Sequence, residues 1–181
     1  MKKTTIGFLA ALAAVSVAGT AQAQLGPTTP FSVEVRGGLA LPTGDDMDDL
    51  HAGIVFGGDV IFQASPMIGI YAGYAFQSWA LENETEDLDF EIKGFEAGAR
   101  LSFAQMAGGL APFLKGGVLH QKSALSADDG SLEGDYETGF QVGGGADVRL
   151  GNRLSFTPQA SFNSVEDSQW VNLEAGLRIR L

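Results

Sequence analysis

Two histidines, His51 and His120, are the side chains of this chain best suited to exchange a proton near neutral pH. His120 lies three residues before Ser123, and the two form the best available pair of base and nucleophile. Hydrolysis requires a nucleophile, a base and an orienting acid together, and a histidine near a strand end is far more often simply solvated. With no cysteine, thiol catalysis and thiolate metal sites are excluded. We therefore expect no enzyme and no catalytic residues.

Acidic clusters are the second feature that could do chemistry. One contains Asp45, Asp46, Asp48 and Asp49, followed by His51, and the other contains Asp128, Asp129, Glu133 and Asp135. Carboxylates at this density could bind Ca²⁺ or Mg²⁺, which prefer several oxygen ligands. Neither cluster has the spacing of a calcium loop, and solvated surface charge explains both. We expect no metal site and no cofactor.

The overall composition narrows the class of protein. The 181 residues carry a net charge of −11, which argues against nucleic acid as a partner because phosphates require surfaces rich in Lys and Arg. A hydrophobic content of 45% with a mean hydropathy of +0.09 excludes a disordered chain and a bundle of membrane helices. Glycine is abundant, with 25 residues, roughly twice its average frequency.

The first 23 residues have the pattern of a secretory signal peptide. Lys2 and Lys3 precede an apolar run over residues 6–18, and Ala21-Gln22-Ala23 resembles a cleavage site. The run is shorter than the roughly 20 residues that a membrane-spanning helix needs. We expect a signal peptide over 1–23, a short periplasmic segment over 24–30 and one domain over 31–181. Without Lys2 and Lys3, nine basic residues face 22 acidic ones, a net charge of −13.

The rest of the chain shows the period-two alternation of strands with two different faces. It is clearest over 136–150, 154–163 and 171–181, and it recurs over 31–41, 54–63, 68–76 and 95–103. An eighth strand is expected from about Phe113 to His120, where we place Lys115 inside. Before the strand over 95–103, whose apolar residues have odd numbers, Leu88, Phe90 and Ile92 are apolar at even-numbered positions. This change of face predicts a bulge or a departure at the rim near Lys93-Gly94. Strands of about a dozen residues exceed the modal length in globular sheets, ~5–6 residues.

The links between these strands alternate in length. Those near Ser65-Pro66, over 104–111 and at Gly151-Asn152 are short and nearly uncharged, whereas those over 42–52, 78–91, 121–135 and 164–169 are longer and acidic. Short turns at one end and long polar loops at the other are typical of a bacterial outer-membrane barrel. Eight antiparallel strands can span the bilayer and close without an edge. The pattern therefore predicts an all-β, eight-stranded antiparallel up-and-down transmembrane β-barrel with both ends in the periplasm.

Charged residues fit this barrel when they are sorted by face. Six acids and six bases are expected to point inward: Glu34, Asp59, Glu96, Glu137, Asp147 and Glu174, with Arg36, Arg100, Lys115, Arg149, Arg178 and Arg180. The other 16 acids fall in the four long links, and no charge falls on the lipid face. Counting rungs places Glu34 near Arg178, Arg36 near Asp59, and Lys115 near Asp147. Inward glycines such as Gly139, Gly143 and Gly145 would leave room for long arginine side chains. A balanced interior indicates salt-bridged packing rather than an ion-selective pore.

The sequence resembles the small eight-stranded outer-membrane β-barrel family that includes the barrel domain of outer membrane protein A. Gly73-Tyr74, Pro112-Phe113 and the last strand carry the resemblance. Members end in alternating apolar residues with an aromatic last residue, which the barrel-assembly machinery reads. Here those places are held by Leu173, Ala175, Leu177, Ile179 and, in place of the aromatic residue, Leu181.

The resemblance implies a monomer in the cell outer membrane whose partners are the lipid bilayer and the assembly machinery. We expect a structural or surface-interaction protein with acidic extracellular loops and a largely closed interior. Three alternatives remain. One is a lipid-modifying enzyme, although the spacing of His120 and Ser123 departs from the His-x-Ser pattern of lipid A deacylases. The others are a narrow channel for small solutes and a water-soluble lipocalin-like barrel with its faces reversed.

Overall fold

A computed structural model describes residues 30–43, 51–81, 88–127 and 130–181. The expected signal peptide over 1–23 and nearly all of the segment over 24–30 lie outside these ranges, as do Asp45, Asp46, Asp48, Asp49, Asp128 and Asp129. Within the described ranges, no helix has the length and apolarity needed to span a bilayer.

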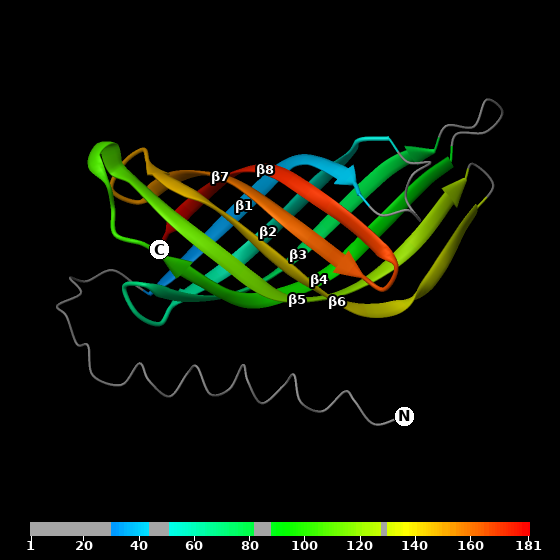
Figure 1. Ribbon diagram of the computed structural model, residues 1–181, viewed down its shortest axis with the longest axis horizontal. Coiled ribbons are helices and arrows are strands. Elements are labelled where there is room, and N and C mark those ends of the chain that lie inside the picture. The colour runs from blue at the N-terminus through cyan, green and yellow to red at the C-terminus, as the bar shows by residue number, and fades with distance from the viewer. Residues whose placement is uncertain (1–29, 44–50, 82–87, 128–129) are drawn as a thin grey trace, which may run out of the picture.

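Eight antiparallel strands form one closed barrel in chain order, because β1 pairs with β8 as well as with β2 (Figure 1). The strands are β1 (Phe31–Pro42), β2 (Gly53–Gln63), β3 (Ile68–Leu81), β4 (Leu88–Ser102), β5 (Leu110–Ala127), β6 (Gly130–Arg149), β7 (Leu154–Val165) and β8 (Ser168–Arg180). The eight strands and their up-and-down order confirm the prediction from sequence. Closure leaves no strand edge with unpaired backbone groups, as the lipid environment requires.

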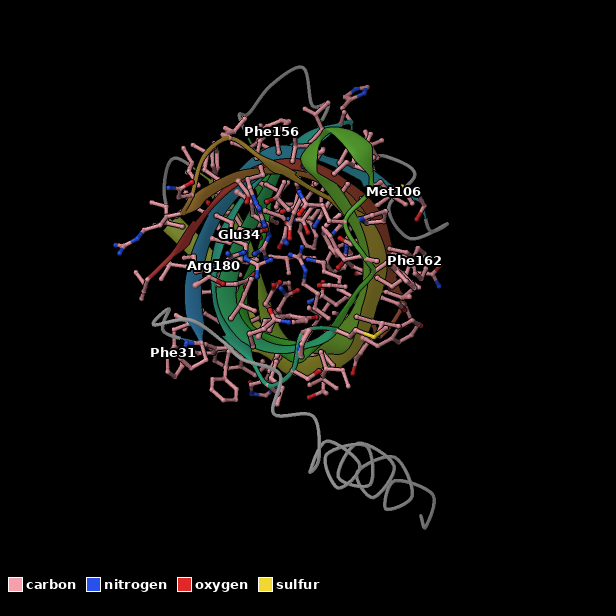
Figure 2. The ribbon with its side chains drawn as sticks, turned by 90° about the vertical axis from the view of Figure 1, so that its left-hand side faces the viewer. Phe31, Glu34, Met106, Phe156, Phe162 and Arg180 are labelled. Atoms are coloured by element: carbon pink, nitrogen blue, oxygen red, sulfur yellow. The ribbon has the colours of Figure 1, made fainter. Side chains whose placement is uncertain are left out.

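The alternation in sequence places apolar side chains on the outer wall. Val35, Phe56, Phe95 and Phe140 are each more than half exposed, whereas Ser32, Glu34, Gln141 and Glu174 are buried. Figure 2 looks along the barrel from one end, with Phe31, Phe156 and Phe162 pointing away from the lumen and Glu34 pointing into it. This arrangement contradicts the lipocalin-like alternative, in which the apolar side chains would point inward.

The two ends of the barrel differ in shape. At the turn end, where the C-terminus lies (Figure 1), residues 64–67, 103–109 and 150–153 connect the strands. Phe31, the first residue of β1, lies at this end too, because its carbonyl accepts a hydrogen bond from the Leu181 amide. The middle connection contains the 3-10 turn η3 (Ala107–Gly109), in which Gly108 and Gly109 have positive φ angles of 82° and 81°, a conformation that glycine adopts without steric cost. At the opposite, loop end, β3 to β6 project beyond the β7–β8 hairpin (Figure 1).

Three expectations about the links are wrong. The link expected over 121–135 is mostly strand, because β5 and β6 continue to a tight hairpin in which Ala127 pairs with Gly130. The link expected over 164–169 is reduced to Glu166 and Asp167, since Val165 pairs with Ser168. The link expected over 78–91 is likewise shorter, since β3 ends at Leu81 and β4 begins at Leu88. Strand pairing therefore continues into segments whose polar composition suggested loops.

The expected bulge near Lys93-Gly94 is also absent from β4, which pairs with β3 and β5 without a shift in register. The irregularity lies between β5 and β6, where Lys122 pairs with Tyr136 but Ala124 pairs with Glu133. The parity break has another cause. Ile92 is buried inside the barrel, so an apolar residue occupies an inward position there.

Candidate functional site: the barrel interior and the outer wall

The centre of the lumen is held by one arginine with three carboxylates. Arg36 on β1 contacts Asp59 at 2.5 Å, Glu96 at 2.7 Å and Glu174 at 2.8 Å, through Nη1, Nη2 and Nε respectively. All four side chains are buried. Charge-assisted hydrogen bonds of this kind are among the strongest in proteins. The pair of Arg36 with Asp59 confirms the rung counting, whereas the contact with Glu96 reaches across the lumen to β4.

A second group of ion pairs lies closer to the turn end. Arg100 contacts Asp147 at 2.6 Å and Glu34 at 3.5 Å, and Arg178 contacts Asp147 at 2.9 Å. Gln159 donates a hydrogen bond of 2.9 Å to Glu34. We call these residues together the ionic network: Glu34, Arg36, Asp59, Glu96, Arg100, Asp147, Glu174 and Arg178. Its members come from β1, β2, β4, β6 and β8, so the network ties opposite walls of the barrel to one another.

The β1–β8 register confirms that Glu34 lies opposite Arg178, although Glu34 forms an ion pair with Arg100. The predicted position of Lys115 near Asp147 is only partly confirmed. Lys115 is buried inside, as predicted, and its ammonium lies 5.8 Å from the ring centre of Tyr71. Asp147, its expected partner, is held instead by the guanidinium groups of Arg100 and Arg178, because these longer forked side chains reach it across the lumen.

Three other residues expected inside lie toward the ends of the barrel. Arg149 is exposed and Arg180 partly exposed, and both line a cavity of about 370 Å³ at the turn end. Glu137 is partly exposed and lies beyond the point where β6 stops pairing with β7. The buried interior among the described residues therefore contains fewer charges than expected, although acids and bases remain nearly balanced.

An apolar cluster packs inside the lumen toward the loop end, and the sequence did not reveal it. Trp79 and Trp170 pack edge to face, with ring centres 5.9 Å apart, and both are 0% exposed. The indole of Trp79 donates a hydrogen bond of 3.0 Å to the carbonyl of Ala40. We call the surrounding set the tryptophan cluster: Ala40, Val55, Trp79, Phe90, Ile92, Leu119, Val165 and Trp170. In the sequence, the tryptophan cluster was indicated by Phe90 and Ile92, which are apolar at inward-facing positions of β4.

Inward glycines provide space for these bulky groups. A Cβ at Gly98 or at Gly117 would lie 2.6 Å from the hydroxyl of Tyr71, and one at Gly57 would lie 3.0 Å from the guanidinium of Arg36. By contrast, Gly139, Gly143 and Gly145, expected to make room for arginines, approach the backbone and short side chains of β7.

His120 lies on the outer wall of β5 and is exposed. Its Nδ1 is 3.2 Å from the hydroxyl of Thr138, and its ring stacks on Tyr136 at 5.0 Å. Its polar partner among the described residues is thus Thr138 rather than Ser123. Among the same residues, no three His, Asp or Glu side chains are placed to hold a metal ion.

The comparisons with known proteins agree with this architecture. Residues 8–176 match the family model described as the outer membrane protein beta-barrel domain. The chain belongs to this family. Its place is therefore the cell outer membrane, with the lipid bilayer around the barrel. No curated protein matches the sequence.

Solved structures share the fold at low identity. Neisserial surface protein A has a TM-score of 0.68 and 12% identity, over 86% of this chain and all of the other. Ail, the attachment invasion locus protein of Yersinia pestis, has a TM-score of 0.59 and 14% identity, over 84% and 99%. OprG from Pseudomonas aeruginosa has a TM-score of 0.55 and 11% identity, over 86% and 99%. At these identities the likeness concerns the fold.

Proposed function

We propose that this outer-membrane barrel is a structural and surface-interaction protein whose interior does not conduct solutes and whose recognition resides in its acidic loop end. The observation that supports the proposal is that side chains occupy the lumen at two levels. The ionic network crosses the lumen between opposite walls, and the tryptophan cluster lies beyond it toward the loops. An eight-stranded barrel holds little more than its own side chains.

Conductance in planar bilayers tests this closure. The wild-type barrel should show no stable open level under conditions in which a porin opens readily. Trp79→Ala with Trp170→Ala should leave the barrel closed because the ionic network remains. Asp147→Asn with Glu34→Gln should also leave it closed, because Arg36 with its three carboxylates and the tryptophan cluster both remain. A large, stable conductance of the wild-type protein would contradict the proposal and favour the narrow-channel alternative.

Recognition at the loop end should favour cationic partners. Asp45, Asp46, Asp48 and Asp49 lie between β1 and β2, and Asp135, Glu137, Glu166 and Asp167 lie on the described rim. A structure of Ail has been solved in complex with the heparin analogue sucrose octasulfate. This chain should instead repel such polyanions, because like charges face each other.

Neutralising the four aspartates of the first loop to asparagine tests this recognition directly. Folding should be retained, and the dependence of surface binding on divalent cations should change. A matched variant, with Asp135, Glu166 and Asp167 neutralised, separates the first loop from the rest of the rim. Unchanged cation dependence and binding in both variants would exclude the acidic loop end as the recognition surface.

Assembly and oligomeric state belong to the same proposal. Leu173, Leu177, Ile179 and Leu181 are about half exposed on the outer wall of β8 and at its end. We propose that this apolar row is read by the barrel-assembly machinery and that the folded barrel is a monomer. The enzyme alternative makes a different prediction, that His120→Ala abolishes a modification seen by mass spectrometry of lipid A.

A further inference from the structure

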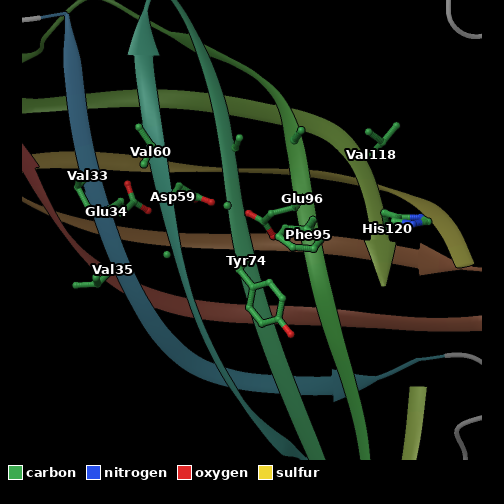
Figure 3. A pocket seen from close by; sticks show the side chains of 14 residues that line it. Val33, Glu34, Val35, Asp59, Val60, Tyr74, Phe95, Glu96, Val118 and His120 are labelled. Carbon is green, nitrogen blue, oxygen red and sulfur yellow. The ribbon is translucent and has the colours of Figure 1, made fainter. Parts of the chain in front are cut away.

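A groove of about 560 Å³ crosses the outer wall over β1 to β5. Its floor is made by the small residues Gly58, Ala72 and Ala97, and its sides include Val60, Tyr74, Phe95, Val118 and His120. Figure 3 shows Tyr74, Phe95, Val118 and His120 around it. Glu34, Asp59 and Glu96 also border the groove, but their carboxylates belong to the ionic network inside the barrel.

Strand register explains why the wall is hollow here. Val60, Ala72, Ala97 and Val118 are successive cross-strand neighbours, so two alanines lie side by side in one row. Gly58, Tyr74, Phe95 and His120 form the next row toward the loop end. Tyr74 and Phe95 pack edge to face at 5.3 Å and stand above the alanines. The result is an apolar depression on a surface that faces lipid.

A third row, one step closer to the loop end, carries positive charge. Phe76, Lys93, Lys122 and Tyr136 are successive cross-strand neighbours there. Lys93 alternates with the buried Ile92 and Gly94, and Lys122 follows the buried Gln121, so both lysines face outward. The sequence analysis predicted no charge on the lipid face, and these two outward lysines show that this prediction is wrong.

Two lysines directly opposite each other on neighbouring strands are unfavourable by themselves, because like charges repel. Lys93 has a carboxylate of Glu91 at 3.6 Å, and the Lys122 ammonium lies 5.9 Å from the ring centre of Tyr136. A lysine on the lipid face costs ~2–4 kcal/mol at the midplane but only ~0–1 kcal/mol near the interface. The row therefore marks the level of the headgroups in the outer leaflet, with the groove just below it.

We propose that this groove and the two lysines bind a phosphorylated lipid of the outer leaflet. An acyl chain lies over Gly58, Ala72 and Ala97, and a phosphate lies between the ammonium groups of Lys93 and Lys122. The phosphate places negative charge beside both ammonium groups, and the chain fills the apolar hollow. A second hollow, lined by residues that include Gly144, Ala160 and Ala175, lies over β6, β7, β8 and β1. These four strands carry no lysine, so this hollow provides an internal control.

Native mass spectrometry of the folded barrel in detergent tests the site, with bisphosphorylated lipid A added at known concentration. Lys93→Gln with Lys122→Gln should weaken binding roughly tenfold, as expected for loss of charge-assisted contacts. Ala72→Phe with Ala97→Phe should weaken it by blocking the groove. The controls Ala160→Phe with Ala175→Phe, and Arg149→Gln with Arg153→Gln, should bind like the wild type. Heat-modifiable migration in gels confirms that each variant is folded.

The probe itself separates the two parts of the site. Dephosphorylated lipid A should bind as weakly as bisphosphorylated lipid A binds to the lysine variant, and glucosamine bisphosphate without acyl chains should not bind. Equal binding of bisphosphorylated lipid A to the wild type, to the lysine variant and to the Ala72→Phe with Ala97→Phe variant would overturn the proposal. So would a dimer, seen by light scattering, that Ala72→Phe with Ala97→Phe dissociates, because a second copy would then cover the groove. These results do not depend on whether the lumen conducts.

Discussion

The two halves of the lumen are packed with opposite kinds of side chain. Toward the turn end, buried charges from five strands neutralise one another, and toward the loop end, two tryptophans fill the space without charge. Ion pairs with short, directed contacts fix which residues face each other across the barrel, but each ion loses its hydration on burial. Apolar packing tolerates small shifts and stabilises by excluding water. The ionic half therefore specifies geometry, and the apolar half contributes packing.

The largest expected effect comes from breaking the ionic half at its centre. Arg36→Met leaves three buried carboxylates without their cation, and it should destabilise the barrel by about 3–5 kcal/mol or more. Unfolding by urea in lipid vesicles measures this change. Adding Asp59→Asn, Glu96→Gln and Glu174→Gln should recover most of the loss. If the fourfold variant is no more stable than Arg36→Met alone, the cost does not arise from unpaired charge.

The apolar half should respond differently to rescue. Trp79→Ala leaves a cavity and removes the hydrogen bond to Ala40, for a loss of about 3–5 kcal/mol. Trp79→Phe should restore part of the packing but not that hydrogen bond. The stability of this variant should therefore lie between those of Trp79→Ala and the wild type. A Trp79→Ala variant as stable as the wild type would show that the loop end is not closed by packing.

Contacts between neighbouring strands could be predicted from the sequence, whereas contacts of long side chains across the lumen could not. Strand number, faces and the pair of Arg36 with Asp59 follow from alternation and from counting between neighbouring strands. The contacts of Arg36 with Glu96 and of Arg100 with Asp147 span strands that are not neighbours. They depend on closure and on arginine length, which no local pattern contains.

The tryptophan cluster escaped prediction for a related reason. An inward apolar residue looks like a break in alternation, so Phe90 and Ile92 suggested a bulge. The actual irregularity lies opposite Ser123, within the long β5–β6 hairpin. The period-two rule assumes one polar and one apolar face over the whole strand, and the loop half of this barrel violates it on the inside.

A charge on the outer wall should cost less than a break in either half of the lumen. Leu177→Arg places a cation in the apolar band, where it should cost ~2–4 kcal/mol and slow assembly. Leu177→Ala is the matched control without charge. Heat-modifiable migration and urea unfolding both report the effect. Equal yields of folded Leu177→Arg and Leu177→Ala would contradict the assignment of this face to lipid.

The smallest expected effects distinguish two buried amides of the lumen. Gln159 donates to Glu34 at 2.9 Å, whereas neither polar atom of the Gln141 amide has a hydrogen-bond partner among the described residues. Gln159→Leu should therefore cost about 1–3 kcal/mol, because it removes a donor to a buried carboxylate. Gln141→Leu removes no such contact and relieves two unsatisfied groups, so it should be neutral or slightly stabilising. Urea unfolding of both variants decides the matter. Equal losses would mean that the ionic network does not extend to Gln159, and that burial alone sets the cost of changing an amide in this lumen.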